Sequence, residues 1–431
     1  MAPAPTSVTA NGCDCNMANT RYVGFFGDSR AYLSFTSNGL HAQLRNVGLA
    51  HWLQAYGDNA FSLLGELNGG IAGDTTGGML ARQPAFIELL KSRACTLAVF
   101  IGSTNDRTNN TDLGVSQKNV REIVRNFLQA GIAVIAISET PRGDGCSQYE
   151  LATQQQKDDH YRMHRWFEEE LSSMCTVLNV WDRMIDSESG SNYYVKPGMT
   201  EDGIHMSKIG AQQVGVVGGP VIAGQVRHLG DYLLSNERYH GGNPLGTLSA
   251  NPLLIGTDGV FDGFTPAAGS QLASEWKASS NNADGLTFTF SQETDERGVR
   301  WQKIHARGQV GGSGASLHIA TSLAVENLSE GDRVKATARV KSAGEGLSNL
   351  ALMLLMTPAW KTKGDPEDST KACPWPSEAI GPLSRETPMY RHVAPDHQTG
   401  LEPRIEVDFA ANAAVDASVW FSQCGAFKFT Y

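Results

Sequence analysis

The sequence has no long apolar run, few cysteines and no cluster of basic residues. No apolar run reaches the roughly 18 residues that a membrane-spanning helix needs. The 7 cysteines among 431 residues are too sparse, and odd in number, for a disulfide scaffold. The formal net charge is −10, and without a basic face we expect no nucleic-acid partner. Hydrophobic residues make up 41% of the chain and charged residues 19%, which is typical of a soluble globular protein.

Two familiar sequence signals are also missing. The first residues, MAPAPTSVTANG, lack the charged and then apolar pattern of a secretory signal peptide. The sequence therefore indicates a protein that is not exported by that route, or one from which the signal has been removed. No Gly-x-Ser-x-Gly follows an expected strand, so the nucleophile elbow of the α/β-hydrolases is absent.

Patterns that could hold a metal ion are incomplete. Cys13 and Cys15 form a Cys-x-Cys pair without a second Cys/His pair at zinc-finger spacing. His160 and His164 are four residues apart on one expected helix, but no third ligand is evident. The stretch 106–112 resembles a calcium loop without its central glycine and final glutamate. We therefore expect no metal site.

Residues 20–230 alternate apolar runs with amphipathic segments. The expected strands span 22–26, 61–67, 96–101, 132–137 and 176–180, and the expected helices span 40–55, 77–91, 120–128, 150–174 and 208–229. The continuous apolar run at 132–137 is typical of a strand buried on both faces of a parallel sheet. This alternation predicts βαβ units with helices on both faces of the sheet.

The composition changes near residue 235. The stretch 236–251 is rich in Gly, Asn, Pro and Ser, which is typical of a linker. Beyond it, short alternating runs span 286–290, 299–306, 316–323, 334–340, 350–356, 405–409 and 418–421. These runs predict an antiparallel sandwich or jelly roll. The predicted parts are an N-terminal arm over 1–20, an α/β domain over 21–235, a linker over 236–251 and a β-sandwich over 252–431.

Four short segments lie where a parallel sheet places its active site, after strands or before a helix. They are Gly27-Asp28-Ser29-Arg30, Gly70-Ile71-Ala72-Gly73-Asp74-Thr75-Thr76, Gly102-Ser103-Thr104-Asn105-Asp106 and Asp202-Gly203-Ile204-His205. Each segment by itself is of a kind that is common in turns, helix caps and loops. Their occurrence together at strand ends favours one shared site.

These segments contain the groups that acyl transfer needs. Ser29 can attack a carbonyl, while His205 takes its proton and returns it to the leaving alcohol. Asp202, three residues before His205, can orient its ring and stabilise its charged form. The N–H groups of Ser29 and Gly73 and the amide of Asn105 would bind the oxyanion, where losing one donor costs about 2.7–4 kcal/mol. This chemistry needs no metal and no organic cofactor.

The four segments resemble the signature blocks of the SGNH (GDSL-like) hydrolases. These blocks are serine in Gly-Asp-Ser, glycine before Asp-Thr, asparagine in Asn-Asp, and histidine three residues after aspartate. The resemblance covers roughly residues 20–230 and implies a flavodoxin-like three-layer α/β/α domain. It implies hydrolysis of esters, often short acyl groups on sugars, or else of lipids or thioesters. By position it names Ser29, Gly73, Asn105 and His205, with Asp202 completing the triad.

Two residues depart from the family pattern. Arg30 stands where the family's older name places leucine, at a position that tolerates change. Ser103 lies two residues before Asn105, where glycine is common, so the loop before Asn105 is expected to differ slightly. Neither change removes a reacting group.

The predicted sandwich carries most of the tryptophans. They are Trp276, Trp301, Trp360, Trp375 and Trp420. One or two exposed rings could stack on sugars, and the alternative is that most of the rings fill the core. The stretch 357–382 is expected to be a long loop and the preferred binding surface. In architecture the domain resembles carbohydrate-binding modules and the C-terminal domains of phage-tail esterases.

The sequence therefore predicts a serine esterase that removes short acyl groups, O-acetyl first, from a polysaccharide or glycan. One alternative is a lipid or thioester hydrolase. Another is a carbohydrate- or receptor-binding protein with a vestigial esterase domain, which the intact Ser29, Asp202 and His205 disfavour. The resemblances suggest an extracellular or phage-particle location, and the sequence leaves the compartment and the oligomeric state open.

Overall fold

The computed structural model describes most of the chain after the first 21 residues. The described residues are 22–35, 44–145, 149–226, 235–243, 246–323, 326, 328–357, 360–363, 375–387, 390–391 and 400–429. The expected N-terminal arm with Cys13 and Cys15, and much of the expected loop at 357–382, lie outside them. Within the described residues, no helix is both long enough and apolar enough to cross a membrane.

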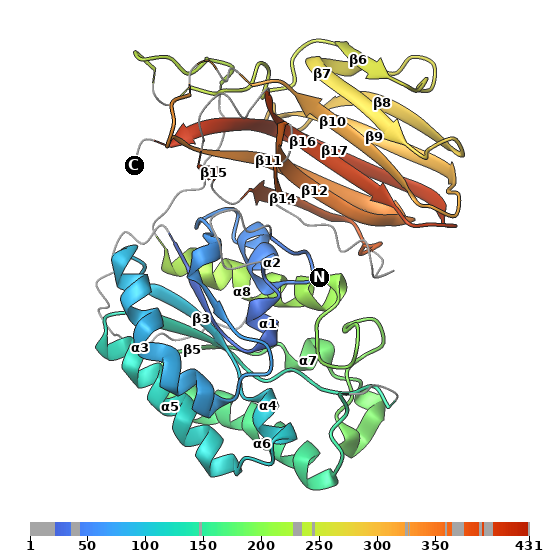
Figure 1. The fold of residues 1–431 in the computed structure, drawn as a ribbon. Coiled ribbons are helices and arrows are strands. Elements are labelled where there is room, and N and C mark those ends of the chain that lie inside the picture. Colours follow the sequence, from blue (N-terminus) through green and yellow to red (C-terminus); the bar gives the residue numbers. More distant parts are fainter. Residues whose placement is uncertain are drawn as a thin grey trace.

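The first half of the chain forms a five-stranded parallel sheet (Figure 1). Its strands are β1 (Gly24–Gly27), β2 (Asn68–Gly70), β3 (Leu97–Ile101), β4 (Ala133–Ile137) and β5 (Thr176–Leu178). They lie in the order β2-β1-β3-β4-β5, which is the flavodoxin-like order. The predicted fold class of this part is therefore confirmed, and the carboxyl ends of the strands share one edge of the sheet.

Helices cover both faces of this sheet and make three layers (Figure 1). The helices are α1 (Ser29–Tyr32), α2 (Leu49–Tyr56), α3 (Thr76–Ser92), α4 (Thr104–Thr108), α5 (Leu113–Gln129), α6 (Gln154–Glu169), α7 (Trp181–Met184) and α8 (Lys208–Gln225), with short 3-10 turns at 65–67, 171–173 and 187–192. Neighbouring residues of a strand point to opposite faces. Phe25 of β1 accordingly packs in the core beneath α2 and α8, and Phe26 packs against α3 and α5.

The expected strand at 61–67 was wrong. Phe61 and Leu67 are buried, which explains the apolar pattern, but residues 65–67 form a 3-10 turn. The strand beside β1 is β2, whose sequence is Asn-Gly-Gly. A Cβ on Gly69 would lie 2.7 Å from the ring of Phe86, so the close packing of the sheet on α3 requires glycine there. For the expected helix at 40–55, the observed helix is Leu49–Tyr56 and residues 44–48 are not helical, while residues 40–43 lie outside the described residues.

The second half of the chain forms two sheets of mostly antiparallel strands. These strands are β6 (Asp258–Asp262), β7 (Leu272–Asn281), β8 (Leu286–Thr294), β9 (Arg300–Gln309), β10 (Ala315–Thr321), β11 (Arg333–Glu345), β12 (Leu347–Thr357), β13 (Trp360–Lys363), β14 (Ile380–Glu386), β15 (Tyr390–Arg391), β16 (Gly400–Phe409) and β17 (Ala414–Phe429). One sheet has the order β13-β12-β16-β10-β7-β6, and the other has β14-β11-β17-β9-β8 with β15 beside β11. The two sheets pack face to face, as the rings of Trp276 and Phe421, 5.3 Å apart, illustrate.

Each of the seven runs expected as strands in this half overlaps an observed strand. The all-β class is therefore confirmed, whereas jelly-roll connectivity and the domain boundaries stay predictions. The strands β6, β7, β13, β14 and β15 were missed. β7 is largely polar on one face and β14 contains Pro382. Within the expected linker, Leu248 is fully buried and its N–H donates to the carbonyl of Ala426 in β17.

The sandwich packs directly on the α/β part. The buried indole of Trp52 in α2 lies 5.4 Å from the ring of Trp375, and the guanidinium of Arg385 lies 5.1 Å from Trp52. Nearby, the amide of Asn46 donates to Asn349 at 2.7 Å. One cluster of buried apolar side chains runs through this contact, from the parallel sheet into the sandwich.

Because the core is shared, we predict that both parts unfold in one cooperative transition. Urea unfolding followed by tryptophan fluorescence and by far-UV circular dichroism should give coincident curves. Trp52→Ala should lower the free energy of unfolding by about 3–5 kcal/mol, since it leaves a cavity at the contact. Trp420→Ala, a half-buried ring on an outer face, is the control and should cost about 1 kcal/mol or less. Two separate transitions in the wild type would contradict the shared core.

Candidate active site

Ser29 lies on a tight turn between β1 and α1. A Cβ on Gly27, at the end of β1, would lie 1.8 Å from the carbonyl oxygen of Ile101, so the turn passes too close to β3 for any other residue. Asp28 caps α1, and its carboxylate accepts the N–H of Arg30 at 2.9 Å. Ser29 is therefore the first residue of a helix at the carboxyl edge of the sheet, and it is 7% exposed.

A chain of hydrogen bonds connects Ser29, His205 and Asp202. The Nε2 atom of His205 lies 2.8 Å from the Ser29 hydroxyl oxygen, and its Nδ1 lies 2.7 Å from Oδ2 of Asp202. The other carboxylate oxygen of Asp202 accepts the N–H groups of Ile204 at 3.2 Å and His205 at 2.8 Å. The three-residue spacing thus folds the segment back on itself, so that one carboxylate holds both the ring and the backbone of His205.

This environment keeps Asp202 ionised. Burial by itself would raise the pKa of Asp202, but the hydrogen bonds from the ring and backbone of His205 outweigh it, so the pKa lies below its ordinary value. A carboxylate at Nδ1 favours the tautomer with its proton on that nitrogen. His205 Nε2 is then free to accept the proton of the Ser29 hydroxyl, which is the geometry of general-base activation.

The segments of Asn105 and Gly73 lie beside each other. The side-chain amide of Asn105 donates to the carbonyl of Asp74 at 2.9 Å. Gly73 has φ +75°, which a residue with a side chain rarely adopts. Neither residue is hydrogen-bonded to Ser29 within the described parts of the chain, so the structure brings the expected oxyanion donors to one edge without joining them to the serine.

Asp106 has a role that the sequence did not reveal. It is fully buried, and its two oxygens accept the N–H of Thr76 at 2.9 Å and the hydroxyl of Thr76 at 2.6 Å. The calcium-like pattern at 106–112 therefore has its first carboxylate already occupied. Asp106 instead joins the start of α3 to the start of α4, and so holds the Gly73 and Asn105 segments together.

Tyr149 is a further residue of the site that the sequence did not indicate. Its half-exposed ring meets the His205 ring edge to face, with 5.6 Å between the ring centres. The guanidinium of Arg142 holds this segment by donating to the carbonyl of Tyr149 at 2.7 Å.

Ile71 lies near the site as well. It is 47% exposed, follows β2 and donates its N–H to the carbonyl of Gly27. No spacing or motif marks Tyr149 or Ile71 in the sequence.

His160 and His164 do not form a metal site. The Nε2 of His160 is bonded to the carbonyl of Thr140 at 2.8 Å, and the ring of His164 is stacked on Trp181 with 4.5 Å between the ring centres. Burial lowers the pKa of His160 well below its ordinary value and that of His164 to about 4. Within the described residues, no group of three His, Cys, Asp or Glu side chains could hold a metal ion.

A comparison with known protein families finds a match in the α/β part of the chain. Residues 25–213 match the model of the GDSL-like lipase/acylhydrolase family. This part of the chain is a GDSL-like lipase/acylhydrolase domain, and the match ends before the first strand of the sandwich. The second half of the chain lies outside it.

Solved structures resemble about half of the chain. A GDSL-like lipase from Bacteroides thetaiotaomicron VPI-5482 is 19% identical, over 48% of this chain and 89% of its own, with a TM-score of 0.34. An acetyl xylan esterase is 17% identical over 45% and 96%, with a TM-score of 0.35. A lipase from a goat rumen metagenome is 15% identical over 49% and 100%, also with 0.35. No curated protein matches the chain. The assignment depends on the family model and not on these structures.

The buried histidines predict a specific dependence of stability on pH. An unfolded histidine binds a proton near pH 6.5, whereas folded His164, with its pKa lowered to about 4 by burial, does not. The stability that neutral His164 contributes is therefore present above pH 6.5 and is lost as the pH falls toward 4, by about 1.4 kcal/mol per pH unit.

The test compares the wild type with His164→Gln, which cannot titrate. The difference between their free energies of unfolding, from urea titrations at pH 7.5, 6.5, 5.5 and 4.5, should shrink as the pH falls. A difference that stays constant across this range would contradict the assignment of His164 as a neutral buried base.

Proposed function

We propose that this protein is a serine ester hydrolase in which Ser29 is the nucleophile, His205 the general base and Asp202 the residue that orients it. The observation that carries the proposal is the continuous chain from the Ser29 hydroxyl through both ring nitrogens of His205 to Asp202, with links of 2.8 and 2.7 Å. Three side chains from two distant segments meet at these distances on the edge where parallel sheets place their active sites.

The proposed reaction has two halves. The Ser29 oxygen attacks the ester carbonyl carbon while His205 Nε2 takes the hydroxyl proton. The tetrahedral intermediate then collapses, the bond to the alcohol breaks, and His205 gives its proton to the alcohol oxygen. Water attacks the acyl–Ser29 ester by the same route, which releases the carboxylic acid and restores Ser29. Asp202 stays ionised throughout and stabilises the imidazolium.

We propose that the N–H groups of Ser29 and Gly73 and the amide of Asn105 bind the oxyanion. The first N–H of a helix carries no intrahelical partner, which suits Ser29 at the start of α1. The positive φ of Gly73 leaves its loop open, since a Cβ there would meet nothing within 4 Å. The bond from Asn105 to the carbonyl of Asp74 holds both candidate donors on one side of the site.

We further propose short acyl groups, acetyl first, as the substrate. Asp28 and Arg30 flank Ser29 in the chain, and both are buried and polar, as is Ser103 on the neighbouring loop. A short acyl group fits beside such polar groups, since it needs no extended apolar surface. Faster cleavage of long-chain esters would instead favour the lipid-hydrolase alternative.

Nitrophenyl acetate, butyrate and octanoate test this proposal directly. We expect the acetyl ester to be cleaved fastest, and Ser29→Ala to lower kcat by at least about 10⁴-fold. Asp202→Asn should lower kcat by about 10⁴-fold, because it favours the wrong tautomer of His205. Asp416→Asn, an exposed carboxylate of the sandwich, is the matched control and should behave as the wild type. Equal activity in Ser29→Ala and the wild type would contradict the proposed triad and favour the binding-protein alternative.

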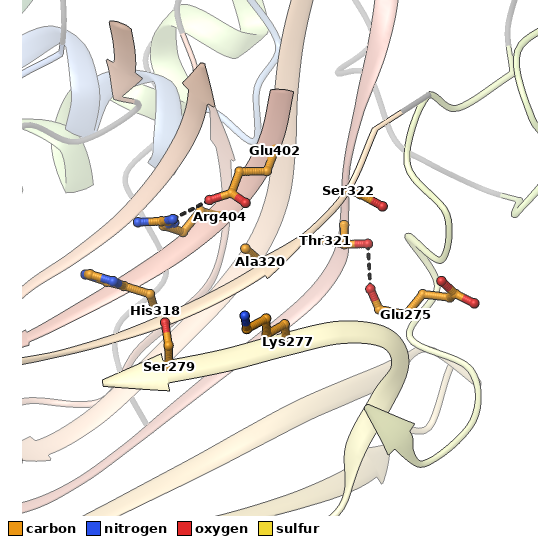
Figure 2. A pocket seen from close by; sticks show the side chains of 9 residues that line it. All are labelled: Glu275, Lys277, Ser279, His318, Ala320, Thr321, Ser322, Glu402 and Arg404. Carbon is orange, nitrogen blue, oxygen red and sulfur yellow. Dashed lines mark hydrogen bonds and ion pairs between the residues drawn. The ribbon is translucent and has the colours of Figure 1, made fainter. Parts of the chain in front are cut away.

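For the sandwich we propose a glycan-binding role at a hollow on the outer face of β7, β10 and β16 (Figure 2). Its volume is about 320 Å³. Ala320 lies in register between Lys277 on β7 and Arg404 on β16, so a small side chain forms the floor between two long ones. Glu275 and Glu402 line one end and His318 lines the other. Such mixed donors and acceptors suit sugar hydroxyl groups better than an apolar ligand.

The positions of the described tryptophans favour this hollow, and not a row of exposed aromatic rings, as the glycan-binding surface. Trp276, Trp301 and Trp375 are buried in the core, which agrees with the alternative that most of the five rings fill the core. Trp420 is half-buried on an outer face, with the ammonium of Lys303 5.0 Å from its ring. The side chain of Trp360 and most of the preferred loop at 357–382 lie outside the described residues.

Filling the hollow tests its role without disturbing the catalytic residues. We expect Ala320→Trp to weaken binding to chemically acetylated xylan about tenfold, measured by affinity electrophoresis, because the indole occupies the site. Thr289→Trp, an exposed residue of β8 on the other sheet, is the matched control. Both variants should cleave nitrophenyl acetate at the wild-type rate. Unchanged binding of Ala320→Trp would argue against this site.

A further inference from the structure

A buried carboxylate, Glu139, joins the two loops that carry Ser29 and Asn105. Glu139 follows β4 and is 1% exposed. Its Oε2 accepts a hydrogen bond of 2.9 Å from Nη1 of Arg30, the residue after Ser29. Its Oε1 accepts a hydrogen bond from the hydroxyl of Ser103, two residues before Asn105. One side chain therefore binds both loops at once.

Arg30 extends this connection to the end of β1. Its Nη2 donates to Oδ2 of Asp28 at 2.7 Å and its Nε to Oδ1 at 3.1 Å, and Asp28 is fully buried. The carboxyl ends of β1, β3 and β4, which are adjacent in the sheet, are thus linked by buried side chains. Buried ion pairs add little net stability, because removing the charges from water offsets most of their attraction. Net stability is therefore a weak explanation for this arrangement.

Ser103 adopts a backbone conformation that favours glycine. Its φ of +108° lies in the left-handed region, where a Cβ is strained. Glycine, common at this position in the family pattern, would relieve the strain but could not bond to Glu139. A leucine in place of Arg30 could not bond to Glu139 either. Arg30 and Ser103, the two residues that depart from the family pattern, therefore both bond to Glu139.

We propose that Glu139, through Arg30 and Ser103, is a positioning residue that sets the distance between the Ser29 nucleophile and the Asn105 amide. This inference rests on the ester hydrolase function proposed above. Oxyanion donors act when they lie about 2.7–3.1 Å from the developing charge, and a displacement of about 1 Å can cost about 10²-fold in rate. A link between the two loops therefore acts on kcat and leaves KM unchanged.

Ser103→Gly separates this role from a structural one. The variant removes the hydroxyl but suits the backbone conformation, so the melting temperature should change by less than about 3 °C. We expect kcat for nitrophenyl acetate to fall about 10-fold with KM unchanged, because the Asn105 loop is no longer held by Glu139. A fall in melting temperature with kcat unchanged would show a structural role and overturn the proposal.

A double-mutant cycle with Asn105→Ala identifies the group through which Ser103 acts. Asn105→Ala alone should lower kcat by about 10²–10³-fold. Ser103→Gly in that background should then change kcat by less than about twofold, because the donor that it positions is already absent. A further 10-fold loss in the double variant would mean that Ser103 acts elsewhere, and would contradict the proposal.

Two further variants complete the test. Glu139→Gln keeps an oxygen for Arg30 and offers an amide to Ser103, so it should retain kcat within about 3-fold, whereas Glu139→Ala should lose at least as much as Ser103→Gly. Ser138→Ala removes another buried hydroxyl, one without a hydrogen bond to any described residue, and should match the wild type. Equal kcat in Glu139→Gln, Glu139→Ala and the wild type would refute a positioning role.

Failure of the underlying function would look different. If Ser29 is not the nucleophile, Ser29→Ala keeps the wild-type rate and Asn105→Ala has no effect. If only the positioning proposal fails, both of those variants lose activity while Ser103→Gly and Glu139→Ala keep it.

Discussion

The carboxyl ends of β1, β3 and β4 lie side by side because the parallel strands take the order β2-β1-β3-β4-β5, and the candidate site depends on this arrangement. The order brings Ser29 and Asn105 to one edge, although they are distant in the chain. Buried polar contacts then hold the loops that leave this edge. Glu139 joins the loops of Ser29 and Asn105, and Asp106 joins the starts of α3 and α4. The site is thus built on the rigid edge of a sheet and not on free loops.

The sandwich is part of the same packed unit. Trp52 of α2 meets Trp375 and Arg385, and a single cluster of buried apolar residues continues across the contact. A shared core fixes the second half relative to the first more firmly than a flexible linker would. The hollow around Ala320 would then lie at a constant distance from Ser29, which suits the proposed binding of an acetylated glycan.

Much of the fold could be predicted, because apolar runs such as 132–137 and the helix at 120–128 carry their own periodicity. β2 could not, because Asn-Gly-Gly has no apolar side chain and its place depends on packing against Phe86. At the site, motif order predicted where Ser29, Asp202 and His205 lie. Glu139 and Tyr149 had no such signal, since each is one polar or aromatic residue after a strand or in a loop. Tryptophan content alone could not distinguish core rings from binding rings.

The most direct test of the central claim is to identify the residue that a fluorophosphonate modifies. Intact-mass measurement and peptide mapping should find one adduct, on Ser29, that is absent from Ser29→Ala and forms much more slowly in Asp202→Asn, because only a serine activated through His205 reacts readily. An adduct on another residue, or none in a folded wild-type protein, would contradict the account.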